Sequence, residues 1–352
     1  MTHAFGRRPR SWLISRLATC LPIELVQYGR AMVLFLGAAS LAVAAPEPVT
    51  PRRVTQPVEH DSDDPAIWVN RQCPAKSLVL GVDKDVAGAI YVFDLQGQSL
   101  PDRTVKGLNR PNNVDVIYDV PLAGQQVDLA VVTERYAHRL RIFRLPEMTP
   151  VDGGGAPVFV DDRANEPMGI ALYQRKRDDA CVAFVSRSEV HAPREGYLHQ
   201  YRLAEDGSGV IRAKFERAFG TWSGKKEIEA VAVDPDLGFV YYSDEGVGVR
   251  KYPADPSDSQ PDQPLALFAT AGFAADQEGI SIYRTDKRRG YLLVSDQSAN
   301  AVHIFPRAGT EQSPHEHPCL AVAPVAAIHS DGNEIAAELA SSVYPGGLLV
   351  MM

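Results

Sequence analysis

The sequence has few cysteines and few segments with helical periodicity. Of its 352 residues only four are cysteines, and three of them, Cys73, Cys181 and Cys319, follow residue 44. Three cysteines allow at most one disulfide bond, so a scaffold held together mainly by disulfides is excluded. We expect that bond to join Cys73 to Cys319, with Cys181 buried in a strand.

Long apolar runs are also scarce, and the clearest one lies near the N-terminus. Five arginines precede an apolar run from Ala31 to Ala45, which contains Ala42-Val43-Ala44 near its end. This run is short for a membrane span and is typical of a secretory signal peptide, with a single anchoring helix as the alternative. We expect residues 1–44 to be a signal peptide and N-terminal extension. Residues 45–352 would be one folded domain, secreted or periplasmic, without stable membrane association.

Positive charge is in deficit. Lys and Arg number 36 against 44 Asp and Glu, which gives a net charge of −8. Residues 1–44 contain five Arg and one Glu, a net +4, which leaves −12 on the remaining domain. Such an acidic domain is not expected to bind nucleic acid, whose backbone is itself negative.

A short strand-like pattern returns six times along the chain. Each copy is an apolar run that usually ends at a carboxylate or a basic residue. The copies are Leu78–Asp83, Leu129–Glu134, Val182–Arg187, Phe239–Asp244, Tyr291–Asp296 and Gly347–Met352. Their starts are 51, 53, 57, 52 and 56 residues apart. A period of about 50 residues is typical of the blades of a β-propeller.

Further runs with a period of two flank these copies. A second alternating run follows most of them, as in Ala89–Phe93, and a third precedes several, as in Asn113–Tyr118. Apolar residues on one face of such runs predict half-buried antiparallel strands. The sequence therefore predicts an all-β fold, a six-bladed β-propeller. A β-sandwich is the alternative that the aliphatic repeats alone would allow.

Acidic residues recur in the loops that a propeller would bring to one end of its channel. Asp61, Asp63 and Asp64 lie within four residues, directly before a strand. Further groups are Asp83 with Asp85, Asn113 with Asp115, Glu227 with Glu229, Asp244 with Glu245, Asp276 with Glu278, Asp296 with Gln297, and Asp331 with Glu334. One such group alone is more often a solvated turn than a ligand set. Several at one channel mouth repel each other unless a cation neutralises them, and oxygen ligands on irregular loops suit Ca²⁺.

Basic residues occupy the same loops. They are Lys84, Arg135, Arg187 or Arg194, Lys225 and Lys226. Cations beside arginines favour a phosphate site, whereas ion pairing with neighbouring carboxylates is the alternative for any single one. An imidazole-based metal site is poorly supported, because His315-Glu316-His317 lies in a proline-flanked loop that we expect to be exposed.

From about Val54 onward, several motifs resemble those of the β-propeller phytases. They are Asp63–Trp68, Leu108–Asp119, Asp276–Tyr283, Gly290–Gln297 and Ser330–Gly332. The resemblance implies a six-bladed, Ca²⁺-dependent phosphatase that removes phosphate from phytate, myo-inositol hexakisphosphate. It implies several Ca²⁺ ions in the cleft, others that stabilise the fold, and direct attack by a metal-bound water without a covalent nucleophile.

Matched position by position, the resemblance also implies the site residues. The metal ligands would be Asp63, Asp64, Asn113, Asp115, Glu229, Glu245, Asp276, Glu278, Gln297 and Asp331. Asn113 and Asp115 would serve a structural or second Ca²⁺. Around the scissile phosphate, the catalytic residues would be Glu229, Glu245, Asp276 and Glu278. The substrate-binding residues would be Lys84, Arg135, Arg194 and Glu195, with Arg187 and Glu189 as the alternative to the last pair.

Departures from the family pattern leave a second function open. Met168 stands where the family has a tyrosine, which removes a hydrogen-bonding hydroxyl, and Ala230 follows Glu229 where the family has glycine. A catalytically impaired Ca²⁺-binding propeller that binds an anionic ligand or partner is therefore the alternative. A lactonase-like Ca²⁺ propeller is a third, but several basic residues favour phosphate. Because ring closure makes a propeller self-sufficient, we expect a monomer.

Overall fold

The computed structural model describes residues 46–339, 341 and 343–352. The predicted signal peptide and extension, residues 1–44, lie outside the described residues. The regular structure consists of strands and of four three-residue 3-10 helices, η1 (Pro74–Lys76), η2 (Pro101–Arg103), η3 (Arg135–Ala137) and η4 (Ala337–Leu339). Within the described ranges, no helix has the length and apolar character needed to span a bilayer. The all-β prediction is confirmed for this part of the chain.

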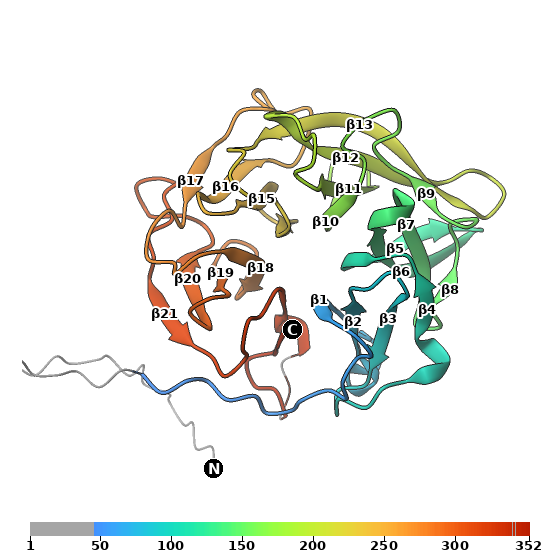
Figure 1. The fold of residues 1–352 in the computed structure, drawn as a ribbon, viewed down its shortest axis with the longest axis horizontal. Helices are drawn as coiled ribbons and strands as arrows, with labels where there is room; N and C mark the ends of the chain where they lie inside the picture. Colours follow the sequence, from blue (N-terminus) through green and yellow to red (C-terminus); the bar gives the residue numbers. More distant parts are fainter. Residues whose placement is uncertain (1–45, 340, 342) are drawn as a thin grey trace, which may run out of the picture. The chain divides into compact units, whose positions relative to one another are not determined.

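Five antiparallel sheets are arranged around a common channel as the blades of a β-propeller (Figure 1). Blade 1 contains β1 (Ser62–Trp68), β2 (Leu78–Asp83), β3 (Gly88–Phe93) and β4 (Val105–Leu108). Blade 2 contains β5 (Pro111–Leu122), β6 (Gln125–Glu134), β7 (Arg139–Leu145) and β8 (Thr149–Pro150), with β9 (Ala156–Pro157) also paired to β7. Blade 3 contains β10 (Pro167–Arg175), β11 (Ala180–Arg187), β12 (Glu195–Glu205) and β13 (Ile211–Thr221).

The remaining strands complete the ring. Blade 4 contains β14 (Val231–Asp234), β15 (Phe239–Asp244), β16 (Gly248–Pro253) and β17 (Ala266–Phe268). Blade 5 contains β18 (Gln277–Arg284), β19 (Gly290–Asp296), β20 (Ala301–Pro306) and β21 (Ala321–Pro324). A two-stranded sheet of β22 (Asn333–Ala336) and β23 (Leu348–Met351) follows.

The prediction of six blades is wrong, because the described residues form five. The sixth copy of the repeat does form a strand, β23, but this strand pairs only with β22. The described residues between these two strands, 337–339, 341 and 343–347, form η4, bends, a turn and one isolated bridge, and no further strand. Side chains of the small sheet pack on blade 1, Ala336 with Ile67 and Val350 with Phe93. The sheet therefore fills the sector between blades 5 and 1 without forming a blade.

The hydrophobic core lies between neighbouring blades. Leu80 of blade 1 clusters with Val132 of blade 2. Leu129 of blade 2 clusters with Ala183 of blade 3, and similar clusters join blade 3 to blade 4 and blade 4 to blade 5. Because a strand alternates its side chains between two faces, each blade can pack against both neighbours at once. This packing fixes the positions of the loops at the ends of the strands.

The cysteine prediction is partly wrong. Cys181 is buried in β11 as expected, but Cys73 and Cys319 are both free thiols. Cys73 precedes η1 in blade 1, whereas Cys319 precedes the outer strand of blade 5. The β22–β23 sheet contacts β1 of blade 1 and β18 of blade 5.

A β-bulge interrupts the beginning of the innermost strand in four blades. The strand register shifts between Ser62 and Pro65, Pro111 and Val114, Pro167 and Ile170, and Gln277 and Ile280. A bulge bends the strand and re-aims its side chains, and it leaves backbone groups outside the regular ladder. The polar residues that begin the inner strands are therefore turned from their regular directions.

Buried hydroxyl groups satisfy the backbone at these bulges and join one blade to the next. The Thr133 hydroxyl accepts from the Asn113 N–H at 3.0 Å in its own blade and donates to the Met168 carbonyl of blade 3 at 2.6 Å. In the same way, the Ser186 hydroxyl accepts from the Gly169 N–H at 2.8 Å and donates to the Ile228 carbonyl at 2.5 Å. These hydroxyls therefore connect the bulged strands of blades 2 and 3 to the beginning of the next blade.

Replacing Thr133 with valine keeps the shape of the side chain and removes both hydrogen bonds. The buried N–H of Asn113 then lacks its partner, so we expect the free energy of unfolding to fall by about 1–3 kcal/mol. Urea unfolding measures the change. Thr149→Val on exposed β8 is the control, with an expected change within about 0.5 kcal/mol. Equal stabilities of the two variants would contradict this role of Thr133.

Candidate metal centre

Three positions repeat around the end of the channel where the innermost strands begin. The exit residue directly follows the second strand of each blade, and these residues are Lys84, Arg135, Ser188, Glu245 and Gln297. The backbone N–H of each exit residue donates to the carbonyl of an entry residue, and the entry residues are Asp61, Arg110, Glu166, Glu227 and Asp276. The residue two positions after the entry residue is named the bulge residue. It is Asp63, Asn112, Met168 and Glu278 in the four bulged blades, and Glu229 holds the equivalent position in blade 4, before the regular strand β14.

The residue before each exit residue is a buried charge with a structural role. Asp83 accepts from the backbone N–H groups of His60 and Asp61, which lead into blade 1. Asp244 accepts from the Ser223 N–H at 3.0 Å and pairs with Arg250 at 2.8 Å. Glu134, Arg187 and Asp296 contact the loops that enter their own blades in the same manner. These charges are neutralised or hydrogen-bonded, and they hold the entry residues in place.

Three glutamates from blades 4 and 5 meet at this end of the channel. Glu229, Glu245 and Glu278 are between 4% and 9% exposed, and each offers a carboxylate oxygen within 4.8 Å of the others. Burial, together with the neighbouring carboxylates, raises the pKa of Glu245 to about 10 and that of Glu278 to about 8. Buried like charges this close favour either bound protons or a bound cation.

Two aspartates of blade 1 extend the acidic group. Burial, followed by the charge of Glu229, raises the pKa values of Asp63 and Asp64 well above the usual range. One oxygen of Asp63 receives the Lys84 ammonium at 2.8 Å, and its other oxygen is buried without a hydrogen-bond partner among the described residues. An oxygen of Glu245 is likewise buried and unpartnered there. Unpartnered carboxylate oxygens in an all-oxygen group fit a hard divalent cation such as Ca²⁺.

Three basic side chains stand around the acidic group. The Lys84 ammonium lies 3.9 Å from Glu229; burial lowers the pKa of Lys84, but Glu229 and Asp63 outweigh burial and raise it overall. The guanidinium of Arg135 donates through Nε to Glu166 at 2.9 Å. Lys226 donates to both oxygens of Asp276, at 2.5 and 2.6 Å. The site therefore combines carboxylates that attract a cation with bases that attract an anion.

The other predicted site residues lie near the acidic group or in the channel cavity described below. Gln297 donates to Asp331, which lies in the loop before β22. Arg194 is exposed, with its guanidinium 5.1 Å from the centre of the Trp222 ring, and Glu195 accepts from Thr221. The Trp222 indole in turn donates to the Lys226 carbonyl. Arg194 thus belongs to the rim on the side of blades 3 and 4.

The structure decides which of Arg187 and Arg194 is accessible, and it corrects the expectation for His317. Arg187 is 2% exposed and donates to Asp162 and to the carbonyls of Ala164 and Tyr197, so its donors are used inside blade 3. Of the two alternatives Arg187 and Arg194, only Arg194 is exposed. The expectation of a solvent-exposed His317 is wrong: this residue is 5% exposed, and its ring contacts buried Lys251 at 3.2 Å.

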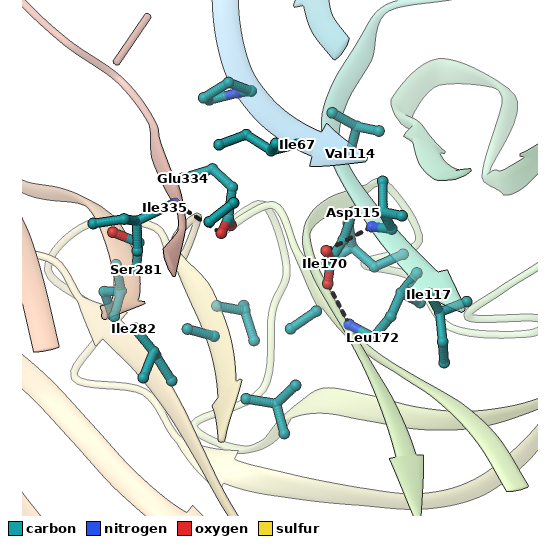
Figure 2. Close-up of a pocket in the computed structure, with 18 of the residues that line it drawn as sticks. Ile67, Val114, Asp115, Ile117, Ile170, Leu172, Ser281, Ile282, Glu334 and Ile335 are labelled. Carbon is teal, nitrogen blue, oxygen red and sulfur yellow. Dashed lines mark hydrogen bonds between the residues drawn. The ribbon is translucent and has the colours of Figure 1, made fainter. Parts of the chain in front are cut away.

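Asn113 and Asp115 lie on the channel side of β5 and are not members of the three-glutamate cluster. They line a cavity of about 440 Å³ between the innermost strands β1, β5, β10, β14 and β18 and strand β22. Figure 2 shows Asp115 and Glu334 projecting into this cavity. Asp115 accepts from the backbone N–H groups of Val116 and Leu172, both at 2.6 Å, and burial raises its pKa to about 7. Its two oxygens therefore have hydrogen-bond donors from the chain itself.

Two residues of the site were not assigned a role from the sequence. Asn112 donates to Glu229 and to Asn113, and Glu166 orients Arg135. The signal that would have found them is the equivalence of positions among blades, because Asn112 and Glu166 are a bulge residue and an entry residue. Lys226, which the sequence analysis named as a basic residue of these loops, pairs with Asp276.

These features together define a β-propeller with a candidate cation site of buried carboxylates beside basic side chains at one end of its channel. A family model described as Phytase matches residues 15–351, and the chain therefore belongs to the phytase family. The chain is also 29% identical over 272 residues to a protein of Bacillus subtilis (strain 168) described as 3-phytase. That match spans 74% of this chain and 66% of the relative, just under two thirds of its length.

Solved structures with similar folds are more distant. The WD40 repeats of RRP9 give a TM-score of 0.49 at 10% identity, over 81% of this chain and 71% of that chain. The structure of U3-55K gives 0.49 at 8% identity, over 81% and 72%. The Dos1 propeller gives 0.44 at 12% identity, over 78% and 62%. Similarities this low carry no inference about function.

The raised pKa values predict how stability depends on pH without metal. Glu278 and Glu245 titrate near 4.5 when unfolded, but burial raises their pKa values to about 8 and 10 when folded. The folded state therefore holds more protons above pH 4.5, so their contribution to stability declines as the pH rises from 4.5 through 8 to 10. With a chelator present, we expect the thermal midpoint to fall between pH 6 and pH 9, and added Ca²⁺ to raise it more at pH 9.

Glu245→Gln is the matched variant for this measurement. It removes one of the two titrating groups and keeps the size of the side chain, so the decline between pH 6 and pH 9 becomes shallower. Differential scanning calorimetry gives the midpoints. Parallel profiles for the variant and the wild type would contradict the assignment of the pH dependence to this cluster.

Proposed function

We propose that this protein is a secreted or periplasmic, Ca²⁺-dependent phosphomonoesterase that hydrolyses phytate. The observation that carries the proposal is the buried group of Glu229, Glu245 and Glu278 with Lys84 and Arg135 beside it, in a chain of the phytase family. The described relative supports the same substrate class through its name, 3-phytase. The pattern of residues 1–44 supports export, and the ring of blades supports a monomer.

The residues that would hold Ca²⁺ are those whose oxygens converge at the mouth of the channel. They are Asp63, Asp64, Glu229, Glu245, Asp276, Glu278, Gln297 and Asp331, with Asn113 and Asp115 as candidates for a second position. Bound there, the ion supplies a Lewis acid that offsets the negative charge of a phosphoryl group. Asp276 is already paired with Lys226, and its carboxylate has further lone pairs for an ion.

The basic residues would bind and orient the substrate. Lys84 carries its charge at the edge of the acidic group, where a phosphate oxygen can approach. Arg135 uses Nε for Glu166, so its terminal N–H groups stay available for a phosphate oxygen. Such fixed donors stabilise the charge that develops on the phosphoryl oxygens during transfer. Arg194 with Glu195 would complete the rim on the side of blade 3.

A specific observation keeps a second function under consideration. The bulge residue of blade 3 is Met168, which is 1% exposed and brings no polar group to the ring. The equivalent positions in the other four blades hold Asp63, Asn112, Glu229 and Glu278. A propeller that binds Ca²⁺ and an anion without efficient hydrolysis is therefore the second candidate.

Phosphate release from calcium phytate tests the proposal. We expect release by the purified protein with Ca²⁺, and at least a 100-fold loss either with EGTA or in a Glu229→Gln variant, because an interaction worth about 3 kcal/mol corresponds to that factor. Glu47→Gln, in the exposed N-terminal segment of the described residues, is the control and should retain wild-type activity. Product analysis identifies the phosphate that is released first.

Two results would count against parts of the proposal. No release in the presence of Ca²⁺, together with a Ca²⁺-dependent rise in thermal midpoint, would favour the binding propeller. Met168→Tyr would then be the first variant to assay. Release that is insensitive to EGTA would contradict the calcium dependence.

A further inference from the structure

Blade 5 holds a cysteine, a histidine and an aspartate in a row. The Sγ of Cys319 lies 3.9 Å from Nδ1 of His303, and Nε2 of the same ring lies 3.6 Å from Oδ2 of Asp296. None of the three belongs to the three-glutamate cluster. A nucleophile beside a base, with the base oriented by a third group, is the arrangement that activates a nucleophilic side chain.

The pairing of neighbouring strands brings these residues together. Asp296 of β19 pairs with Ala301 of β20, two residues before His303, so Asp296 and His303 are diagonal neighbours on one face of the sheet. The segment that leads into β21 also pairs with β20, because the Leu320 N–H donates to a β20 carbonyl at 2.8 Å. This bond holds Cys319, the preceding residue, beside His303.

His303 is fixed in a position suited to a base. It is 3% exposed, and its ring stacks on the Phe273 ring, with centres 3.8 Å apart and planes at 17°. Burial lowers the pKa of His303 and outweighs the opposing effect of Asp296, so the ring is neutral at neutral pH. The charge of Asp296 favours the tautomer with its proton on Nε2, which leaves the Nδ1 lone pair to Cys319.

The thiol of Cys319 is accessible and has two acceptors nearby. Cys319 is exposed, and its Sγ also lies 3.5 Å from the Ala321 carbonyl. A carbonyl oxygen accepts a hydrogen bond but does not take up the proton, whereas a neutral imidazole does. Because the thiolate is the reactive form of cysteine, contact with His303 favours reaction at this sulfur.

The other two cysteines among the described residues lack this arrangement. Cys181 is 5% exposed, and burial raises the pKa of its thiol to about 12. Cys73 is half-buried, and its side chain makes no hydrogen bond in the described part of the chain. Cys73 therefore serves as an internal reference for an accessible thiol without a base.

We propose that Cys319 is a reactive thiol that His303 activates for exchange with small disulfides, the oxidised forms of low-molecular-weight thiols. The Cys319 sulfur attacks one sulfur of the disulfide and passes its proton to Nδ1 of His303. The S–S bond of the reagent breaks as a new one forms to Cys319, and the departing thiolate takes a proton from His303 or water. Cys319 is thereby oxidised to a mixed disulfide, and one half of the reagent is reduced to a thiol.

The test incubates the full chain with glutathione disulfide and follows each cysteine by peptide mass spectrometry. We expect Cys319 to react at least about 10-fold faster than Cys73 in the same sample, and His303→Gln to remove this advantage. His303→Phe keeps a ring to stack on Phe273 but has no nitrogen, so it should lose the same factor. His315→Gln is the control and should keep the wild-type ratio, because its ring packs on Phe239.

The direction of the change separates activation from a folding defect. Local unfolding in either His303 variant would expose Cys319 further and make it react faster, whereas loss of the base makes it react more slowly. Equal rates at Cys319 and Cys73 in the wild type, or a Cys319 rate that neither variant lowers, would overturn the proposal. A product that joins two copies of the chain through Cys319 would overturn the assignment to small disulfides.

Discussion

The hydroxyl groups that join neighbouring blades are the interaction on which the site depends. Thr133 and Ser186 each bind the bulged backbone of their own blade; Thr133 also donates to the first strand of the next blade, and Ser186 to the segment that leads into the next blade. Without them, bulged N–H groups would be buried without partners. The bulges can therefore persist in a packed ring, and the polar residues that they carry keep a fixed spacing around the channel. The close approach of Glu229 to Glu278 is one result.

At the end of a second strand, the last strand residue has a structural role and the residue that follows it belongs to the candidate site. Asp244 is neutralised by Arg250 and fixes the loop that enters blade 4, while Glu245, the next residue, joins the three-glutamate cluster. Asp83 and Lys84 divide the roles in the same way. Burial and like charge then raise the pKa values of the site carboxylates, and this unfavourable concentration of charge is what makes the end of the channel attractive to a cation.

The sequence predicted the propeller and most of the acidic group, because both follow from a repeat whose phase is visible in the chain. It overestimated the number of blades, since the period cannot show that Leu348–Met351 has only one partner strand. It favoured Arg194 over Arg187, but only the contacts show that Arg187 is a buried structural cation and Arg194 an accessible one. The Cys73–Cys319 pairing failed for a similar reason, because the sector between blades 5 and 1 holds a sheet that spacing does not reveal.

The alternation along β15 limits how such a ring can diverge. A substitution at Glu245 changes the chemistry at the channel and leaves Asp244 and its loop contacts in place. A one-residue insertion in the strand would instead exchange the directions of these two side chains. Asp244 would then face the channel, and Glu245 would face the packing between blades. Proteins with this fold should therefore differ in residue type, but not in length, at the ends of their second strands. Insertions and deletions should accumulate in the outer loops.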